Sequence, residues 1–395
     1  MNTYGVAIFN DEKKPRSGFS CVDGKVKEFS SYSDLEMSTI WVTNIQHSIF
    51  QKEALYKVPN LRSSQYLRLS LQQIMRELNV KKDIEGIQHL AKLVQSIASD
   101  LQGKFELNPD YLRYRLGGEI PQYLESQGFL PSELLNISEL ADASAKAALN
   151  DAYQSFQGTV KSANGKIYHY TLPRVAHFEY LMNQNFPLDN NWEEFTFSSD
   201  GSIVAGYKNK VLLPDTEKVI IGLKNLHKNT AAILNIKVKS IDPKRAQSFT
   251  FGIEGVKSTT RIWAALPEVI DILRYCEVEI LGGLKTNAGK LDVRPEIDLS
   301  KNRYSYSKGV VSENIWCALA DKVHLGSQKQ ATGLGVYLRA YDRIICSKLA
   351  EAFMKAGFVG GGFGVGAARV WLSNQDVKKA NIIAEKFGAM PDIGV

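Results

Sequence analysis

The chain has 395 residues, of which 44% are hydrophobic and 23% are charged. These fractions are those of an average folded globular protein, and they exclude a wholly disordered, collagen-like or coiled-coil chain. The 48 lysines and arginines exceed the 42 acidic residues and give a net charge of +6. A basic excess of this size allows an anionic partner without requiring one.

The four cysteines lie far apart and form no C-x-x-C pair. This spacing predicts a reducing cytoplasm and no structural zinc. No apolar run approaches the ~20 residues of a membrane-spanning helix. Charges follow the first short apolar stretch directly, which differs from a secretory leader. We therefore expect a cytoplasmic protein that does not enter a membrane.

Short β-prone segments dominate the first sixty residues. Residues 4–9 and 18–29 predict an N-terminal hairpin, with a turn signal at Asp23-Gly24, and residues 39–43 predict a further strand. From Ser63 the pattern becomes helical, and apolar residues spaced by three and four predict a helix over 83–101.

The middle of the chain differs in composition from its two ends. Residues 103–200 are rich in Gln, Asn, Ser and Tyr and show few strand signals, so we expect a helical insertion there. Strand patterns return at 219–223, 233–239 and 248–254, and helices are expected at 267–275, 342–355 and from Ser373 to Gly388. The sequence predicts an α+β protein whose core comprises residues 1–102 and 201–395.

Six glycines stand among the ten residues from Gly357 to Gly366. Such a segment brings bare backbone N–H groups close to an anion. It lacks a following Gly-Lys-Ser/Thr and precedes a strand pattern, which argues against ATP and NAD. Two interpretations stay open: a packed glycine hinge, or contact with a nucleic-acid phosphate. The second would use Gly361, Gly362 and Gly364, and the charge of Arg369 supports it.

No local motif carries catalytic chemistry. The six histidines are mostly isolated, so no metal site is predicted, and there is no Gly-x-Ser-x-Gly signature. A site assembled only in space stays open. From the sequence we expect no enzyme, no catalytic residues, no metal and no cofactor.

Basic and aromatic residues alternate in three places, at 111–115, 303–308 and 337–343. Cationic side chains neutralise phosphates while aromatic rings stack on splayed bases. If Tyr337, Arg339 and Tyr341 belonged to a strand, all three side chains would share one face. An ordinary amphipathic strand is the alternative for each cluster, but together the three favour single-stranded nucleic acid.

Two segments resemble the backbone subunit of CRISPR Cascade complexes, a RAMP protein that polymerises along guide RNA. One comprises Ile49-Phe50 and Leu61-Arg62-Ser63-Ser64-Gln65-Tyr66-Leu67-Arg68. The other runs from His324-Leu325-Gly326-Ser327-Gln328 into Gly335-Val336-Tyr337-Leu338-Arg339, similar to a family turn that leads into a strand. Together they cover under a tenth of the chain.

The resemblance implies an RRM-like or ferredoxin-like antiparallel sheet with a late glycine-rich loop. It implies that the RNA backbone is held by Arg62, Ser63, Ser64, Gln65 and Arg68. Ser63 or Ser64 suits a helix N-cap, and the free N–H groups of a helix start suit a phosphate. The same residues also suit a capped helix without a ligand.

Taken with the resemblance, the candidate nucleic-acid contacts extend to the second motif, namely His324, Ser327, Gln328 and Arg339. The expected function is a non-catalytic subunit that binds single-stranded RNA or DNA and repeats as the backbone of a CRISPR-type ribonucleoprotein in antiviral defence. Its expected partners are copies of itself and other subunits of the complex. The alternative is a phage or plasmid structural or assembly protein without nucleic-acid chemistry.

Overall fold

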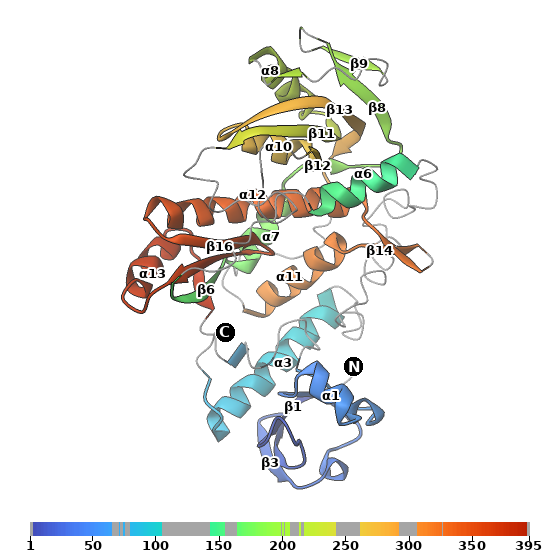
Figure 1. Ribbon diagram of the computed structural model, residues 1–395. Coiled ribbons are helices and arrows are strands. Elements are labelled where there is room, and N and C mark those ends of the chain that lie inside the picture. Colours follow the sequence, from blue (N-terminus) through green and yellow to red (C-terminus); the bar gives the residue numbers. More distant parts are fainter. Residues whose placement is uncertain are drawn as a thin grey trace. The chain divides into compact units, whose positions relative to one another are not determined.

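The computed structural model describes residues 3–64, 71, 74–75, 80–104, 143–154, 164–198, 200, 202–205, 213–214, 217–241, 261–291, 306–325 and 327–392. The chain divides into two compact units, residues 1–120 with 295–315 and residues 121–294 with 316–395 (Figure 1). The expected helical insertion at 103–200 stays a prediction, because residues 105–142 lie outside the described ranges.

The first unit contains a five-stranded mixed sheet in the order β3-β2-β1-β4-β5. In that order the strands span Lys25–Phe29, Gly18–Val22, Thr3–Phe9, Thr39–Thr43 and Leu61–Arg62. Strand β2 is antiparallel to β1 and β3, whereas β4 is parallel to both β1 and β5. The predicted N-terminal hairpin and the strand at 39–43 are confirmed.

Helix α3 (Ile84–Lys104) packs on β1 and β2 of this sheet. Its apolar side chains at three- and four-residue spacing are buried, and they include Ile87, Leu90, Val94 and Ile97. The predicted helix over 83–101 is therefore confirmed. The described residues of this unit also form helix α1 (His47–Lys52) and the single 3-10 turns Tyr32–Asp34 and Leu55–Lys57.

The described residues of the second unit form two main sheets and a separate two-stranded hairpin. The larger has seven strands with the main order β12-β11-β13-β8-β9, and β7 and β10 also pair with β13. In chain order its strands are β7 (Phe186–Pro187), β8 (Glu193–Phe197), β9 (Ile203–Ala205), β10 (Leu213–Pro214), β11 (Thr230–Ile241), β12 (Arg261–Ala265) and β13 (Cys276–Gly289).

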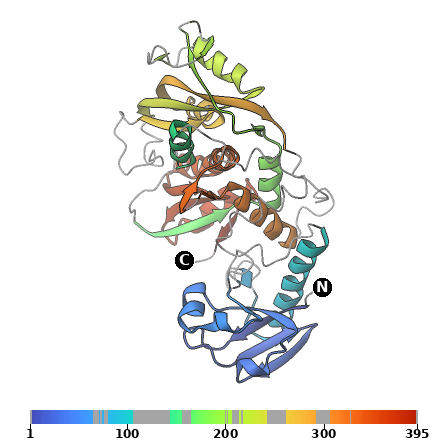
Figure 2. The same cartoon turned by 90° about the vertical axis from the view of Figure 1, so that its right-hand side faces the viewer.

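The smaller sheet has four antiparallel strands in the order β16-β17-β6-β18. These strands span Val359–Gly364, Ala367–Leu372, Lys166–Thr171 and Met390–Asp392. Helix α12 (Gly333–Lys355) lies between the two sheets of this unit (Figures 1 and 2). Phe353 of α12 packs with Tyr170, Val370 and Leu372 in a hydrophobic cluster that also contains strand residues of the larger sheet.

Two sequence predictions in this unit are wrong. The expected strand at 219–223 is part of helix α8 (Glu217–Leu226), whose buried residues Val219, Leu223 and Leu226 have helical spacing. The expected strand through Tyr337, Arg339 and Tyr341 is the first half of α12. In both places an apolar or alternating run of five residues is too short to separate a strand period from a helix period.

The remaining elements complete the α+β chain. They are α6 (Ala143–Gln154), α7 (Arg174–Met182), α10 (Leu266–Ile272), α11 (Tyr306–Ala320), β14 (Val323–Leu325), β15 (Gln328–Gln330) and α13 (Val377–Glu385). Within the described ranges, no helix combines the length and the apolar character that crossing a membrane requires.

Candidate nucleic-acid interface

The glycine-rich segment forms most of strand β16 and its turn into β17, and is not a free loop. Gly362 and Gly364 have φ values of +119°, and Gly366, beyond the tip, has +68°. Residues other than glycine rarely adopt these backbone angles, so glycine is required at these three positions. A bulge between Gly360 and Gly362 directs Gly361 toward Ile167, whose Cδ1 would lie 2.8 Å from an added Cβ.

One face of the four-stranded sheet packs on α12, and the opposite face, called here the outer face, is half-buried. Arg369 of β17 pairs in register with Gly362 of β16 and with His169 of β6. Trp371 pairs in the same way with Val359 and Ile167. Because side chains two residues apart in a strand point the same way, Arg369 and Trp371 share this face.

The outer face therefore combines a cation, an imidazole and an indole beside a strand with almost no side chains. Arg369, His169 and Trp371 are all partly exposed, and Trp371 Nε1 is a buried donor with no acceptor among the described residues. Arg369 forms no ion pair within the part of the chain described here. Such a face suits an anionic ligand that carries aromatic rings better than it suits a metal ion.

Asp342 of α12 fixes the tip of the β16–β17 hairpin. Its carboxylate is 1% exposed and accepts hydrogen bonds from the backbone N–H groups of Val365 and Gly366, the latter at 2.7 Å. His177 Nε2 lies 3.0 Å from Asp342 Oδ1, and the Cys346 thiol donates to the same oxygen at 3.4 Å. Three hydrogen-bond donors and the imidazole of His177 thus converge on one buried carboxylate.

These contacts set the charge of Asp342. Burial alone would raise its pKa, but the hydrogen bond and charge of His177, with the N–H groups of Gly366 and Val365, outweigh burial and lower the pKa below 3.8. Burial and the charge of Asp342 raise the pKa of Cys346 well above its usual value. Asp342 is therefore ionised and Cys346 is a thiol at neutral pH.

His177, Asp342 and Cys346 also form a group of potential metal ligands, with ligand atoms within 4.8 Å of one another. Both oxygens of Asp342 already accept backbone N–H groups, and the three side chains are buried. A metal ion would have to displace those hydrogen bonds. The arrangement fits a structural anchor of the hairpin better than a metal centre.

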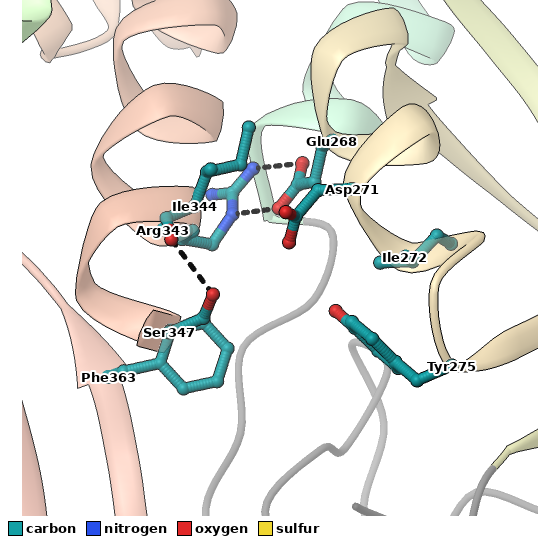
Figure 3. Close-up of a pocket in the computed structure, with 8 residues that line it drawn as sticks. All are labelled: Glu268, Asp271, Ile272, Tyr275, Arg343, Ile344, Ser347 and Phe363. Atoms are coloured by element: carbon teal, nitrogen blue, oxygen red, sulfur yellow. Dashed lines mark hydrogen bonds and ion pairs between the residues drawn. The ribbon is translucent and has the colours of Figure 1, made fainter. Parts of the chain in front are cut away.

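A pocket beside this anchor is lined in part by a buried ion pair between Arg343 and Glu268 (Figure 3). Arg343 Nε and Nη2 donate to the two oxygens of Glu268 at 2.6 and 2.9 Å. Arg343 also donates to the backbone carbonyls of Ala152 and Tyr153 at the end of α6. Because the guanidinium is already shared among these acceptors, the ion pair joins α12, α10 and α6 and offers little to a ligand.

The first sequence motif lies in the other unit. Arg62 ends β5, and its Nη1 donates to two carbonyls of its own segment at 2.6 and 3.0 Å. Ser63 follows, and Ser64 is fully buried, so its hydroxyl is not accessible to a phosphate in this conformation. Gln65 and Arg68 lie outside the described residues. Their role as phosphate contacts stays a prediction.

The second motif leads into a helix and not into a strand, because α12 follows the β14–β15 hairpin. His324 lies in β14, while Ser327 and Gln328 are exposed at the turn and in β15. Arg339 lies on α12 over the ring of Tyr153, 5.1 Å from its centroid.

Of the predicted residues that the structure describes, one group comes together on the outer face and its hairpin, namely Gly361, Gly362, Gly364 and Arg369. Sequence reasoning missed His169 and Trp371, although the alternation of Ala367–Leu372 gave a signal for Trp371. His169 gave no local signal toward Arg369, because the two lie 200 positions apart and meet only through strand pairing.

No family model and no curated protein matches this chain. Solved structures of phi29 DNA polymerase do match. The complex with primer-template DNA has a TM-score of 0.47 at 12% identity and covers 94% of this chain and 80% of the polymerase. The complex with single-stranded DNA has a TM-score of 0.45 at 10% identity, covering 95% and 81%. The orthorhombic crystal form has a TM-score of 0.47 at 11% identity, covering 95% and 81%.

These matches are to structures of a DNA polymerase, and two of the three contain bound DNA. Against them, the prediction of a non-catalytic, RNA-binding subunit repeated in a CRISPR complex is wrong, as are the expectations of antiviral defence and of a chain that is not an enzyme. The alternative of an assembly protein without nucleic-acid chemistry finds no support in them either. No match bears on the RAMP resemblance, which stays a prediction. The TM-scores are below 0.5, so no residue role or activity is carried from the polymerase to this chain.

Proposed function

We propose that this chain binds single-stranded DNA across the outer face of the four-stranded sheet, and that this sheet is an RRM-like module. Its first strand, β6, lies within the range 103–200, where the sequence predicted a helical insertion and not part of the RRM-like core. The strand order supports the module. Strand β6 comes first in the chain, β16 and β17 follow as a hairpin, and β18 comes last after α13. With α12 before the hairpin, the connections have the β-α-β-β-α-β pattern of ferredoxin-like folds, with the seven-stranded sheet inserted between β6 and β16.

The observation that carries the binding proposal is the registered row of Gly362, Arg369 and His169 beside Trp371. RRM-like sheets bind nucleic acid on the face that their helices leave open, where aromatic rings stack on bases. Here the guanidinium of Arg369 would pair with a phosphate, and His169 would add a hydrogen bond. Trp371 supplies the aromatic surface for one base.

The glycines of β16 serve the same ligand. Gly362 projects no side chain beside Arg369, so a sugar-phosphate backbone can come close to the strand. Asp342 holds the hairpin tip from the core side, opposite the outer face. The basic excess of the chain adds a general attraction for DNA.

The cytoplasm is the compartment we propose for this activity. All four cysteines are buried and unpaired, as expected where thiols stay reduced. The homo-oligomer and additional subunits expected from the sequence stay predictions.

The test is Arg369→Gln, which removes the charge and keeps most of the side-chain stem. Fluorescence anisotropy with labelled single-stranded DNA, primer-template DNA and RNA is measured over a series of salt concentrations. Loss of one charge-assisted hydrogen bond, about 1.5 kcal/mol, predicts about tenfold weaker DNA binding. The slope of the logarithm of the binding constant against the logarithm of the salt concentration should become less steep by about 0.7, the value for one phosphate contact on a single strand.

Arg261→Gln is the matched control, because Arg261 is an exposed arginine on edge strand β12 and its loss changes net charge equally. Equal weakening by both substitutions would show that only net charge matters and would refute the interface. Wild-type DNA affinity in a folded Arg369→Gln variant would refute it as well. Primer extension measured in parallel tests whether the bound DNA is also a substrate.

A further inference from the structure

A second cationic cluster lies where α6, α12 and the β14–β15 hairpin meet, and it comprises Tyr153, Lys322, Lys329 and Arg339. Lys322 Nζ and the Arg339 guanidinium each lie 5.1 Å from the centroid of the Tyr153 ring. The backbone of Tyr153 is held in place, because its carbonyl accepts a hydrogen bond from Arg343 at 3.0 Å. The ring thus holds two cations at a fixed place on α6.

The charges of this cluster are poorly compensated. Arg339 Nη2 lies 3.8 Å from Asp321, whose side chain is 34% exposed, and this is a weak pair. Lys322 Nζ donates to the neutral Oδ1 of Asn150 at 2.9 Å. Within the described residues neither Lys322 nor Lys329 forms an ion pair with an acid. Among the described residues, the Arg339–Asp321 pair is thus the one ion pair of this cluster, although the charge of buried Asp342 also acts on Arg339.

Two further observations indicate unused binding capacity. Arg339 Nε is buried and has no hydrogen-bond acceptor in the described part of the chain. Burial and the charge of Lys329 lower the pKa of Lys322. An anion placed between the lysines would relieve this repulsion.

We propose that the Tyr153 cluster binds a phosphate group. Lys322 and Lys329 would provide the ammonium donors, and Arg339 would add positive potential from α12. A compact charge of two or more units compensates three cations best, which favours a phosphate over a carboxylate. This site shares no residue with the outer face of the four-stranded sheet. The phosphate can belong to a free polyphosphate or to a nucleic-acid strand.

Isothermal titration calorimetry of the full chain separates these sources, with inorganic tripolyphosphate and single-stranded DNA as the two probes. Lys329→Gln is the main variant, because Lys329 is exposed and its substitution leaves the core unchanged. Lys322→Gln is the second variant. Lys378→Gln is the control, since Lys378 is exposed on α13 and its loss changes the net charge equally.

We expect about tenfold weaker binding of at least one probe in both cluster variants and wild-type binding in the control. A loss confined to tripolyphosphate identifies a free polyphosphate, and a loss confined to DNA identifies a nucleic-acid phosphate. Binding of neither probe by wild type, or equal affinities in wild type and both cluster variants, would overturn the proposal. Arg369→Gln distinguishes this site from the outer face. Because Arg369 is not part of the Tyr153 cluster, this variant should bind tripolyphosphate with wild-type affinity, even if the proposed DNA interface on the sheet is wrong.

Discussion

Replacing Asp342 by Asn tests whether one buried carboxylate holds the glycine-rich hairpin. The substitution keeps the shape of the side chain but removes its charge and one of its acceptor oxygens. Asn can still accept one of the two backbone N–H groups of Val365 and Gly366, while its own NH2 group faces the other. It also replaces the charged partner of His177 at 3.0 Å by a neutral amide.

The expected loss of stability is large. A hydrogen bond to a charged group contributes about 1.5–3 kcal/mol, and a buried donor left without an acceptor costs about 1–3 kcal/mol. Because Asn keeps one acceptor, we expect the free energy of unfolding to fall by about 3 kcal/mol. Urea denaturation followed by tryptophan fluorescence measures it, since Trp316 packs edge-on against His177. Hydrogen exchange at Val365 and Gly366 should accelerate as well.

The pH dependence supplies a second readout. The pKa of Asp342 is lowered in the folded chain, so its stabilisation is fully present above the unfolded value of 3.8 and is lost as pH falls through the folded pKa. The stability difference between wild type and Asp342→Asn should therefore shrink below pH 3.8. Glu385→Gln, at an exposed site on α13, is the control and should change stability by under about 0.5 kcal/mol. A difference of less than about 1 kcal/mol between wild type and Asp342→Asn at neutral pH would refute the anchor.

Three other outcomes follow from the same region. Glu268→Ala leaves Arg343 buried without its carboxylate and should destabilise the chain by about 3–5 kcal/mol in urea denaturation, and a variant as stable as wild type would contradict this. Gly366→Ala should lower the melting temperature, because φ is +68° there, and an unchanged melting temperature would argue against that backbone angle. A thiol reagent should modify none of the four buried cysteines before unfolding, Cys346 included, and rapid native labelling would disagree with their burial.

The elements predicted well from the sequence are those whose pattern is local and long. In helix α3 the described side chains of Ile87, Leu90, Val94 and Ile97 are buried at three- and four-residue spacing, a period that only a helix explains. The N-terminal hairpin was predictable because the turn at Asp23-Gly24 uses residues that tolerate positive φ, 49° and 75° here. Short runs failed. The apolar stretch at 219–223 and the alternation at 337–341 each fit two periods, and packing selected the helix.

Helix α12 shows how tertiary contacts made that selection. Tyr337 exchanges two hydrogen bonds with the backbone of Ala232 in β11, and Tyr341 donates to the carbonyl of Asn185. Both rings are buried one helical turn apart, so they are core residues and not a base-stacking surface. The sequence showed basic and aromatic residues together in this stretch. Whether the tyrosines pack in the core or face a ligand depended on hydrogen-bond partners 105 and 156 positions away in the sequence.

The sequence by itself determined that the chain is an α+β protein, that its late segment needs glycine, and that Arg369 stands beside that segment. Only the tertiary structure decided that the glycines form a strand, that Asp342 anchors its turn, and that Arg369 lies in register with His169. The physical reason is the distance along the sequence between the residues that interact. Backbone angles and amphipathic periods are set by neighbours in the sequence, whereas a binding face is made by strands and helices whose pairing depends on the burial of the whole unit.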